Sequence, residues 1–157
     1  MAEVAIIGAG ELGGALAHVL ARIDAVAAIR LVDDGGRVAE GKALDIMQAG
    51  AVEQFATRVS GATELISAAG ARVLFITDRA DRADGSAGEW QGEEALMLLK
   101  RIAQLGGSPV VVWAGPGGRE PIERGVRELK FARDRLFGTA PEALAAAVRA
   151  MVAVETA

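Results

Sequence analysis

The chain has 157 residues, of which 52% are hydrophobic, and its formal net charge is −4. This length suits one buried core and is too short for two ordinary domains, so we expect a single domain over residues 1–157. The acidic balance, without a long basic run, excludes nucleic acid and anionic membrane surfaces as expected partners, and the lack of cysteine excludes disulfides and thiolate metal sites.

Short apolar runs alternate with helical patterns along almost the whole chain, which is typical of a parallel sheet with helices on both faces. We expect strands at Glu3–Ile7, Ala28–Val32, Ala56–Ser60, Val73–Ile76, Val110–Trp113 and Arg135–Phe137. We expect helices at Glu11–Ile23, Arg37–Ala49, Thr63–Ala68, Glu89–Leu105, Pro121–Leu129 and Pro141–Val154. The predicted fold class is α/β, a single Rossmann-type doubly wound parallel sheet of about six strands.

A glycine motif follows the first predicted strand directly. Gly8, Gly10 and Gly13 form G-x-G-x-x-G, and an acidic residue follows the third glycine by twenty residues. In a strand-to-helix context this spacing favours a dinucleotide site, because the glycines allow a tight turn and close approach of a pyrophosphate to the free N–H groups of the next helix. We expect cofactor contacts from Gly8, Gly10, Glu11, Leu12, Gly13, Asp33, Asp34 and Thr77.

The acidic residues after the second predicted strand indicate which dinucleotide is bound. Asp33 can accept hydrogen bonds from the ribose hydroxyls, and a 2′-phosphate would meet both Asp33 and Asp34. This pair favours NAD over NADP. The alternative is a glycine-rich turn that binds no ligand.

Three further segments carry a family resemblance. They read G-K-A-L-D-I-M-Q-A-G-A-V at Gly41–Val52, V-L-F-I-T at Val73–Thr77 and L-F-G-T-A at Leu136–Ala140. Together they resemble the lactate/malate dehydrogenase family from Val4 to about Arg149, over that family's N-terminal, NAD-binding domain only. The resemblance implies binding of NAD or a related adenine nucleotide, and it implies that the family's C-terminal domain with the catalytic histidine is absent.

Position by position, the resemblance implies that most substrate and catalytic groups are replaced. Arg82 keeps the first arginine of the substrate loop, whereas the second falls on Gly88. Gly115 stands where the family has an asparagine that orients the carbonyl, and Leu144 and Ala147 stand where it has an aspartate and an arginine. We expect no catalytic residue in this chain, with Arg82 the only retained substrate-loop candidate.

A charged run, D-R-A-D-R-A-D-G-S-A-G, occupies Asp78–Gly88. Its acidic residues lack the alternating order of oxygen ligands in a calcium loop, so we predict a solvated loop and no metal site. His18, the only histidine, has no acidic partner at helical spacing and is expected to be structural. Trp113, at the end of the fifth predicted strand, is expected either to fill the nicotinamide pocket or to pack in the core.

The helix at Gly41–Val52 carries an apolar stripe at helical spacing, made of Ala43, Leu44, Met47 and Ala51. We expect this stripe to serve as core and as the interface of a homo-oligomer. Without a signal-peptide or membrane-spanning pattern, we expect a cytoplasmic protein.

Three functions fit these observations. The first is an NAD-binding domain that cannot oxidise a 2-hydroxy acid alone and serves as a sensor, a regulatory subunit or a degenerate subunit. The second is an oxidoreductase completed by a partner chain, and the third is an assembly module that no longer binds nucleotide.

Overall fold

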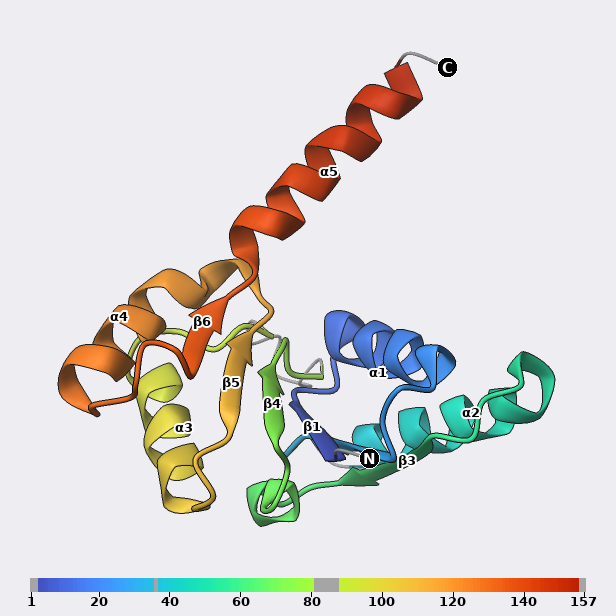
Figure 1. Ribbon diagram of the computed structural model, residues 1–157, viewed down its shortest axis with the longest axis horizontal. Coiled ribbons are helices and arrows are strands. Elements are labelled where there is room, and N and C mark those ends of the chain that lie inside the picture. The colour runs from blue at the N-terminus through green and yellow to red at the C-terminus, as the bar shows by residue number, and fades with distance from the viewer. Residues whose placement is uncertain (1–2, 36, 81–87, 156–157) are drawn as a thin grey trace.

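The computed structural model describes residues 3–35, 37–80 and 88–155. Its sheet has six parallel strands in the order β3-β2-β1-β4-β5-β6 (Figure 1). The strands are β1 Glu3–Ile7, β2 Ala28–Val32, β3 Arg58–Ala62, β4 Val73–Ile76, β5 Val110–Trp113 and β6 Leu136–Gly138. The strand order reverses between β1 and β4, and in sheets of this kind ligands bind at that point, beyond the carboxyl ends of the strands. The predicted fold class is confirmed.

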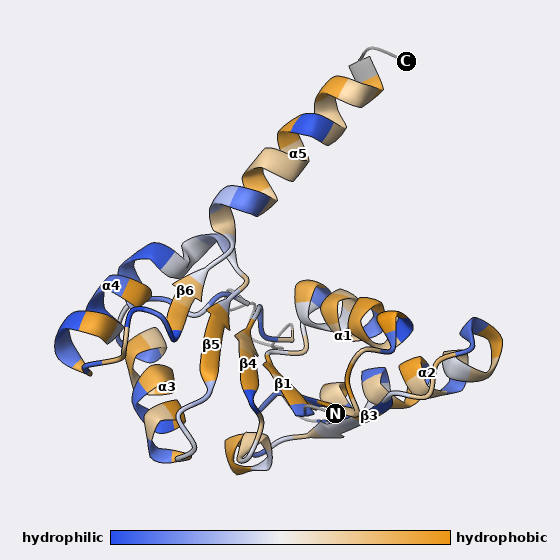
Figure 2. Ribbon diagram, viewed as in Figure 1, coloured by the Kyte–Doolittle hydropathy of each residue, from blue (hydrophilic) through white to orange (hydrophobic). Residues whose placement is uncertain are grey.

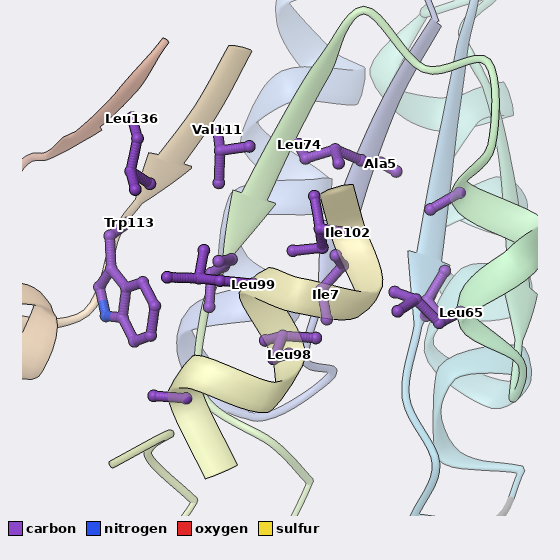
Figure 3. Packing of buried hydrophobic residues seen from close by; sticks show 14 residues of the cluster. Ala5, Ile7, Leu65, Leu74, Leu98, Leu99, Ile102, Val111, Trp113 and Leu136 are labelled. Atoms are coloured by element: carbon purple, nitrogen blue, oxygen red, sulfur yellow. The ribbon is translucent and has the colours of Figure 1, made fainter. Parts of the chain in front are cut away.

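Helices cover both faces of the sheet. One face carries α1 (Glu11–Ile23) and α2 (Val38–Glu53), and the other carries α3 (Gly92–Gln104), α4 (Arg119–Glu128) and the short helix η1 (Leu65–Ala68) (Figure 1). Side chains of β1 alternate between the faces, so that Ile6 packs under α1 and α2 while Ile7 packs under α3. Figure 3 shows Leu98, Leu99 and Ile102 of α3 directed onto the strands. Both halves of the core are therefore built on the central strand that leads into the glycine motif.

Some predicted boundaries are wrong, for identifiable reasons. The third strand begins at Arg58 instead of Ala56, because the N–H groups of Ala56 and Thr57 are donated to the side chain of Asp24 at the end of α1. The helix expected at Thr63–Ala68 is only the short 3₁₀ helix η1. Helix α3 begins at Gly92, so Glu89 lies in the preceding loop and not in the helix. The second helix continues to Glu53, and Gln54 ends it in the left-handed conformation.

Helix α5 (Ala140–Glu155) projects away from the sheet (Figure 1). Its described side chains beyond Ala140 are exposed, including apolar ones at Leu144, Val148 and Met151, and Figure 2 shows hydrophobic bands along its length. Between β5 and α4 lies a second short helix, η2 (Pro116–Gly118). Within the described part of the chain, no helix is both long and apolar enough to cross a membrane.

Candidate functional site

The glycine turn lies where β1 ends and α1 begins. Gly8 adopts φ +110°, a conformation that side-chain-bearing residues rarely reach, and its N–H donates to the carbonyl of Val32 at 2.8 Å. A Cβ atom on Gly13 would overlap the carbonyl of Gly8, so the missing side chain lets α1 start directly against the turn. Thr77 closes the other side, since its hydroxyl donates to the Gly8 carbonyl at 2.9 Å. Thr77 is buried and its hydroxyl supports the turn.

Asp33 follows β2 at the same edge of the sheet and is only 4% exposed. Its Oδ2 accepts the backbone N–H groups of Ala9 at 2.7 Å and Ala80 at 2.8 Å, and its Oδ1 accepts that of Gly35 at 2.7 Å. The sequence places this carboxylate correctly beside the glycine turn. It does not reveal that three backbone donors occupy it.

Asp78, the first residue after Thr77, is half-buried and extends its carboxylate onto the first turn of α1. Oδ1 accepts the N–H of Gly13 at 3.0 Å, and Oδ2 accepts that of Leu12 at 3.3 Å. A Cβ atom on Gly10 would overlap this carboxylate, so Gly10 makes the approach possible. Two N–H groups expected to face a phosphate are thus taken by a side chain of the protein itself.

Arg79 is buried, with a side chain only 6% exposed. Its guanidinium lies 4.6 Å from the centre of the Trp90 ring, and its Nη2 lies 3.1 Å from a carboxylate oxygen of Glu94 on α3. The prediction of a solvated loop is therefore wrong for Asp78, Arg79 and Ala80. The physical reason is that the planar guanidinium of Arg79 can be buried when its face stacks on the indole of Trp90 and its edge contacts the carboxylate of Glu94.

Two hollows share Asp78 and Glu89 in their linings. The larger, of about 470 Å³, is bordered by Gly10, Val38 and Lys42. The smaller, of about 150 Å³, is bordered by residues that include Leu12, Thr77, Trp90, Trp113 and Gly117. We refer to these two hollows together as the groove; they lie at the carboxyl edge of the sheet, and Asp78 borders both.

Lys42 places a positive charge beside the glycine turn. Its Nζ donates to the carbonyl of Gly10 at 2.9 Å and lies 3.4 Å from a carboxylate oxygen of Glu11. A Cβ atom on Gly14 would lie 3.1 Å from Cδ of Lys42 and would crowd the aliphatic part of this side chain. Sequence reasoning missed Lys42 as a site residue, because no linear spacing connects α2 to the glycine turn.

The remaining predicted site residues have varied surroundings. Glu11 and Asp34 are exposed at the rim, and Leu12 is 38% exposed on the first turn of α1. Arg82 lies outside the described residues. In the described ranges, no cluster of three or more histidine, aspartate or glutamate side chains is arranged to hold a metal ion.

Packing decides the surroundings of three further features that the sequence singled out: His18, Trp113 and the apolar stripe of α2. His18 lacks an acid on its own helix but pairs with Glu53 of α2, whose carboxylate lies 2.9 Å from Nε2. Trp113 is 3% exposed and joins the core (Figure 3). It also borders the smaller hollow. Within the apolar stripe of α2, Ala43 is buried whereas Leu44 is 58% exposed and Met47 is 39% exposed, so the stripe is only partly core.

No protein-family profile matches the chain. It is 31% identical over 104 residues to a malate dehydrogenase of Pelagibacter ubique, covering 66% of this chain and 32% of that protein. Malate dehydrogenase from Salinibacter ruber superimposes with a TM-score of 0.73 at 23% identity, over 87% of this chain and 44% of that chain. This chain is similar to the N-terminal part of malate and lactate dehydrogenases.

A lactate dehydrogenase of Cryptosporidium parvum, solved with lactic acid and NAD, has a TM-score of 0.72 at 19% identity, over 88% of this chain and 44% of that chain. The family resemblance predicted from the sequence is thus confirmed. The chain spans about a third of the curated malate dehydrogenase and under half of the solved structures.

Proposed function

We propose that this chain is a dinucleotide-binding domain of the malate and lactate dehydrogenase type, which holds NAD and does not transfer hydride by itself. The observation that carries the proposal is the meeting of the Gly8–Gly13 turn with Asp33 at the point where the strand order reverses. Both hollows are bordered by residues that follow β1 and β4 at this point. Binding of the NAD pyrophosphate at this edge would require the carboxylate of Asp78 to leave the N–H groups of Leu12 and Gly13 in the first turn of α1.

The adenosine half would lie in the larger hollow, between the glycine turn and the first turn of α2. Oδ1 of Asp33, which among the described residues accepts only the N–H of Gly35, would accept one further hydrogen bond from a ribose hydroxyl, and the exposed residue Asp34 follows it in the chain. The 2′-phosphate of NADP would face both negative charges, so NAD is the preferred ligand.

Loss of the chemistry follows from what stands at the family's catalytic positions. Gly115 has no side chain with which to orient a carbonyl group, and Leu144 is an exposed residue of α5. A partner chain could supply a histidine but could not restore side chains within this domain. We therefore rank an oxidoreductase completed by a partner below a silent NAD-binding domain, and an assembly module without ligand is the third candidate.

Assembly through α2 is part of the same proposal. Leu44 and Met47 expose apolar surface on the segment Gly41–Val52, where we place the interface of a homo-oligomer. A cytoplasmic location stays a prediction.

Calorimetric titration with NADH, NADPH and ADP tests the proposal. Val38, 37% exposed, borders the larger hollow, so Val38→Trp fills that hollow from the surface of α2. Val52→Trp, at an 84% exposed position near the other end of α2, is the matched control. We expect saturable NADH binding that Val38→Trp abolishes and Val52→Trp preserves. Equal binding by both variants would overturn the proposal, as would a failure of NADH to bind both the wild type and an Asp78→Ala protein.

A further inference from the structure

We propose that Asp78 sets the ligand affinity of the groove by acting as an internal anion, which competes with the pyrophosphate of a dinucleotide for the N-terminus of α1. This inference rests on the proposed function and adds a specificity-determining residue to it. It also states the chemical class that the residue acts against, namely ligands that carry phosphate groups.

The competition follows from the donors that are involved. The N–H groups of Leu12 and Gly13 belong to the first turn of α1, where free donors and the helix dipole attract an anion. Both already donate to Asp78, at 3.3 Å and 3.0 Å. A phosphate oxygen needs the same donors in the same place, so the carboxylate and the phosphate exclude each other.

Charge adds to the steric exclusion. A carboxylate left close to an incoming pyrophosphate repels it, because both carry negative charge in a half-buried groove. Lys42, with its Nζ 2.9 Å from the Gly10 carbonyl, provides a positive charge beside the glycine turn. The ligand must therefore displace the Asp78 carboxylate, and the attraction between its phosphates and Lys42 is reduced by the cost of that displacement.

The backbone around Asp78 is held independently of its side chain. The carbonyl of Asp78 accepts the N–H of Gly10 at 2.9 Å, and the N–H of Ala80 donates to Asp33 at 2.8 Å. Arg79 is anchored on Trp90 and Glu94 of the opposite layer. Removal of the Asp78 carboxylate should thus free the N–H groups of Leu12 and Gly13 for a phosphate, while the backbone from Asp78 to Ala80 keeps its position.

Asp78→Ala removes the carboxylate, and Asp78→Asn removes only its charge. Asp134→Asn is the matched control, because Asp134 is exposed and borders a hollow formed with Arg72 and Val110 at the amino ends of β4 and β5. The dissociation constants of NADH, ADP and adenosine are measured for each protein by calorimetry, and circular dichroism checks that each variant is folded.

We expect Asp78→Ala to lower the dissociation constants of NADH and ADP by about tenfold or more, equivalent to about 1.4 kcal/mol, with a smaller gain for Asp78→Asn. Adenosine, which has no phosphate, and the Asp134→Asn protein should show no gain. Detectable binding by Asp78→Ala alone also supports the inference.

Two results would overturn the inference while leaving the proposed function intact: equal NADH affinity in the wild type and both Asp78 variants, or an equal gain for adenosine. Failure of both the wild type and Asp78→Ala to bind any of the three ligands would overturn the proposed function, and the inference with it.

Discussion

The carboxylate of Asp33 accepts the backbone N–H of Ala80 at 2.8 Å, across 47 residues of sequence. This hydrogen bond joins the end of β2 to the segment that follows β4. The same carboxylate accepts the N–H of Ala9 in the glycine turn and that of Gly35 in the loop before α2. One buried side chain thus organises the three loops that form the groove, in addition to any contact with a ribose.

Replacement of Asp33 should therefore destabilise the fold as well as the binding site. Asp33→Ala leaves three backbone donors without their acceptor, and we expect a loss of about 3 kcal/mol in the free energy of unfolding in urea. Asp45→Ala, at an exposed position of α2, should change that free energy by less than about 0.5 kcal/mol. Equal stability of the two variants would contradict the structural role of Asp33.

The acid sensitivity of the fold should depend on Asp24, which follows α1. The hydroxyl of Thr57 donates to it and, together with the backbone N–H groups of Thr57 and Ala56, holds the pKa of the Asp24 carboxyl below its ordinary value. A lowered pKa means that the charged form is favoured in the folded state. The resulting stability is fully present above the unfolded pKa and is lost as the pH falls through the folded pKa.

Asp24→Asn isolates this charge, because Oδ1 alone accepts all three hydrogen bonds and asparagine tolerates the left-handed backbone at this position. We expect the variant to melt below the wild type at about pH 7 and the difference to shrink as the pH falls below about 4, the ordinary pKa of an aspartate, through the lowered pKa of Asp24. The measurement is a series of thermal melts across this range. A difference that persists unchanged in acid would show that the charge of Asp24 is not its cause.

The sequence is sufficient to predict the strands that consist of continuous apolar runs. The boundaries of β1, β2, β4 and β5 agree with the structure, since burial on both faces of a parallel sheet leaves a clear pattern. The start of β3 could not be predicted in this way, because Ala56 and Thr57 give their N–H groups to Asp24, more than 30 residues earlier. A local pattern contains no information about such a partner.

The same limit applies to the candidate site. Gly8 and Asp33 could be placed together, because the carboxyl ends of neighbouring parallel strands share one edge. The position of Asp78, two residues after the end of β4, was a signal that it reaches that edge as well. Its hydrogen bonds to α1, and the burial of Arg79 against α3, depend on packing between elements that are far apart in sequence.

Anchoring of Arg79 should depend on the planar shape of its guanidinium. Arg79→Lys keeps the charge but loses the stack on Trp90 and the paired contact with Glu94. We expect this variant to lose about 1 to 2 kcal/mol of stability toward denaturant and Arg79→Ala to lose at least as much. A lysine variant as stable as the wild type would show that charge alone holds the segment.

Assembly in solution should depend on α2 if the proposed interface is right. Leu44→Glu introduces a charge at a 58% exposed apolar position of α2, and Val148→Glu does so at a 52% exposed position of α5. We expect sedimentation equilibrium to show dissociation for Leu44→Glu and no change for Val148→Glu. The reverse result would move the interface to α5, and a wild-type monomer would remove it.

Energy transfer from the indoles to bound NADH would show that a dinucleotide lies along the groove from Gly10 to Trp90. Trp90 and Trp113 both border the smaller hollow, where the nicotinamide half would lie. We expect NADH to quench indole emission saturably and to show sensitised nicotinamide emission. The measurement uses the wild-type chain and the Asp78→Ala variant, so that the indoles of Trp90 and Trp113 are the donors and no tryptophan is introduced at position 38. Absence of quenching and of sensitised emission in both proteins would contradict the account.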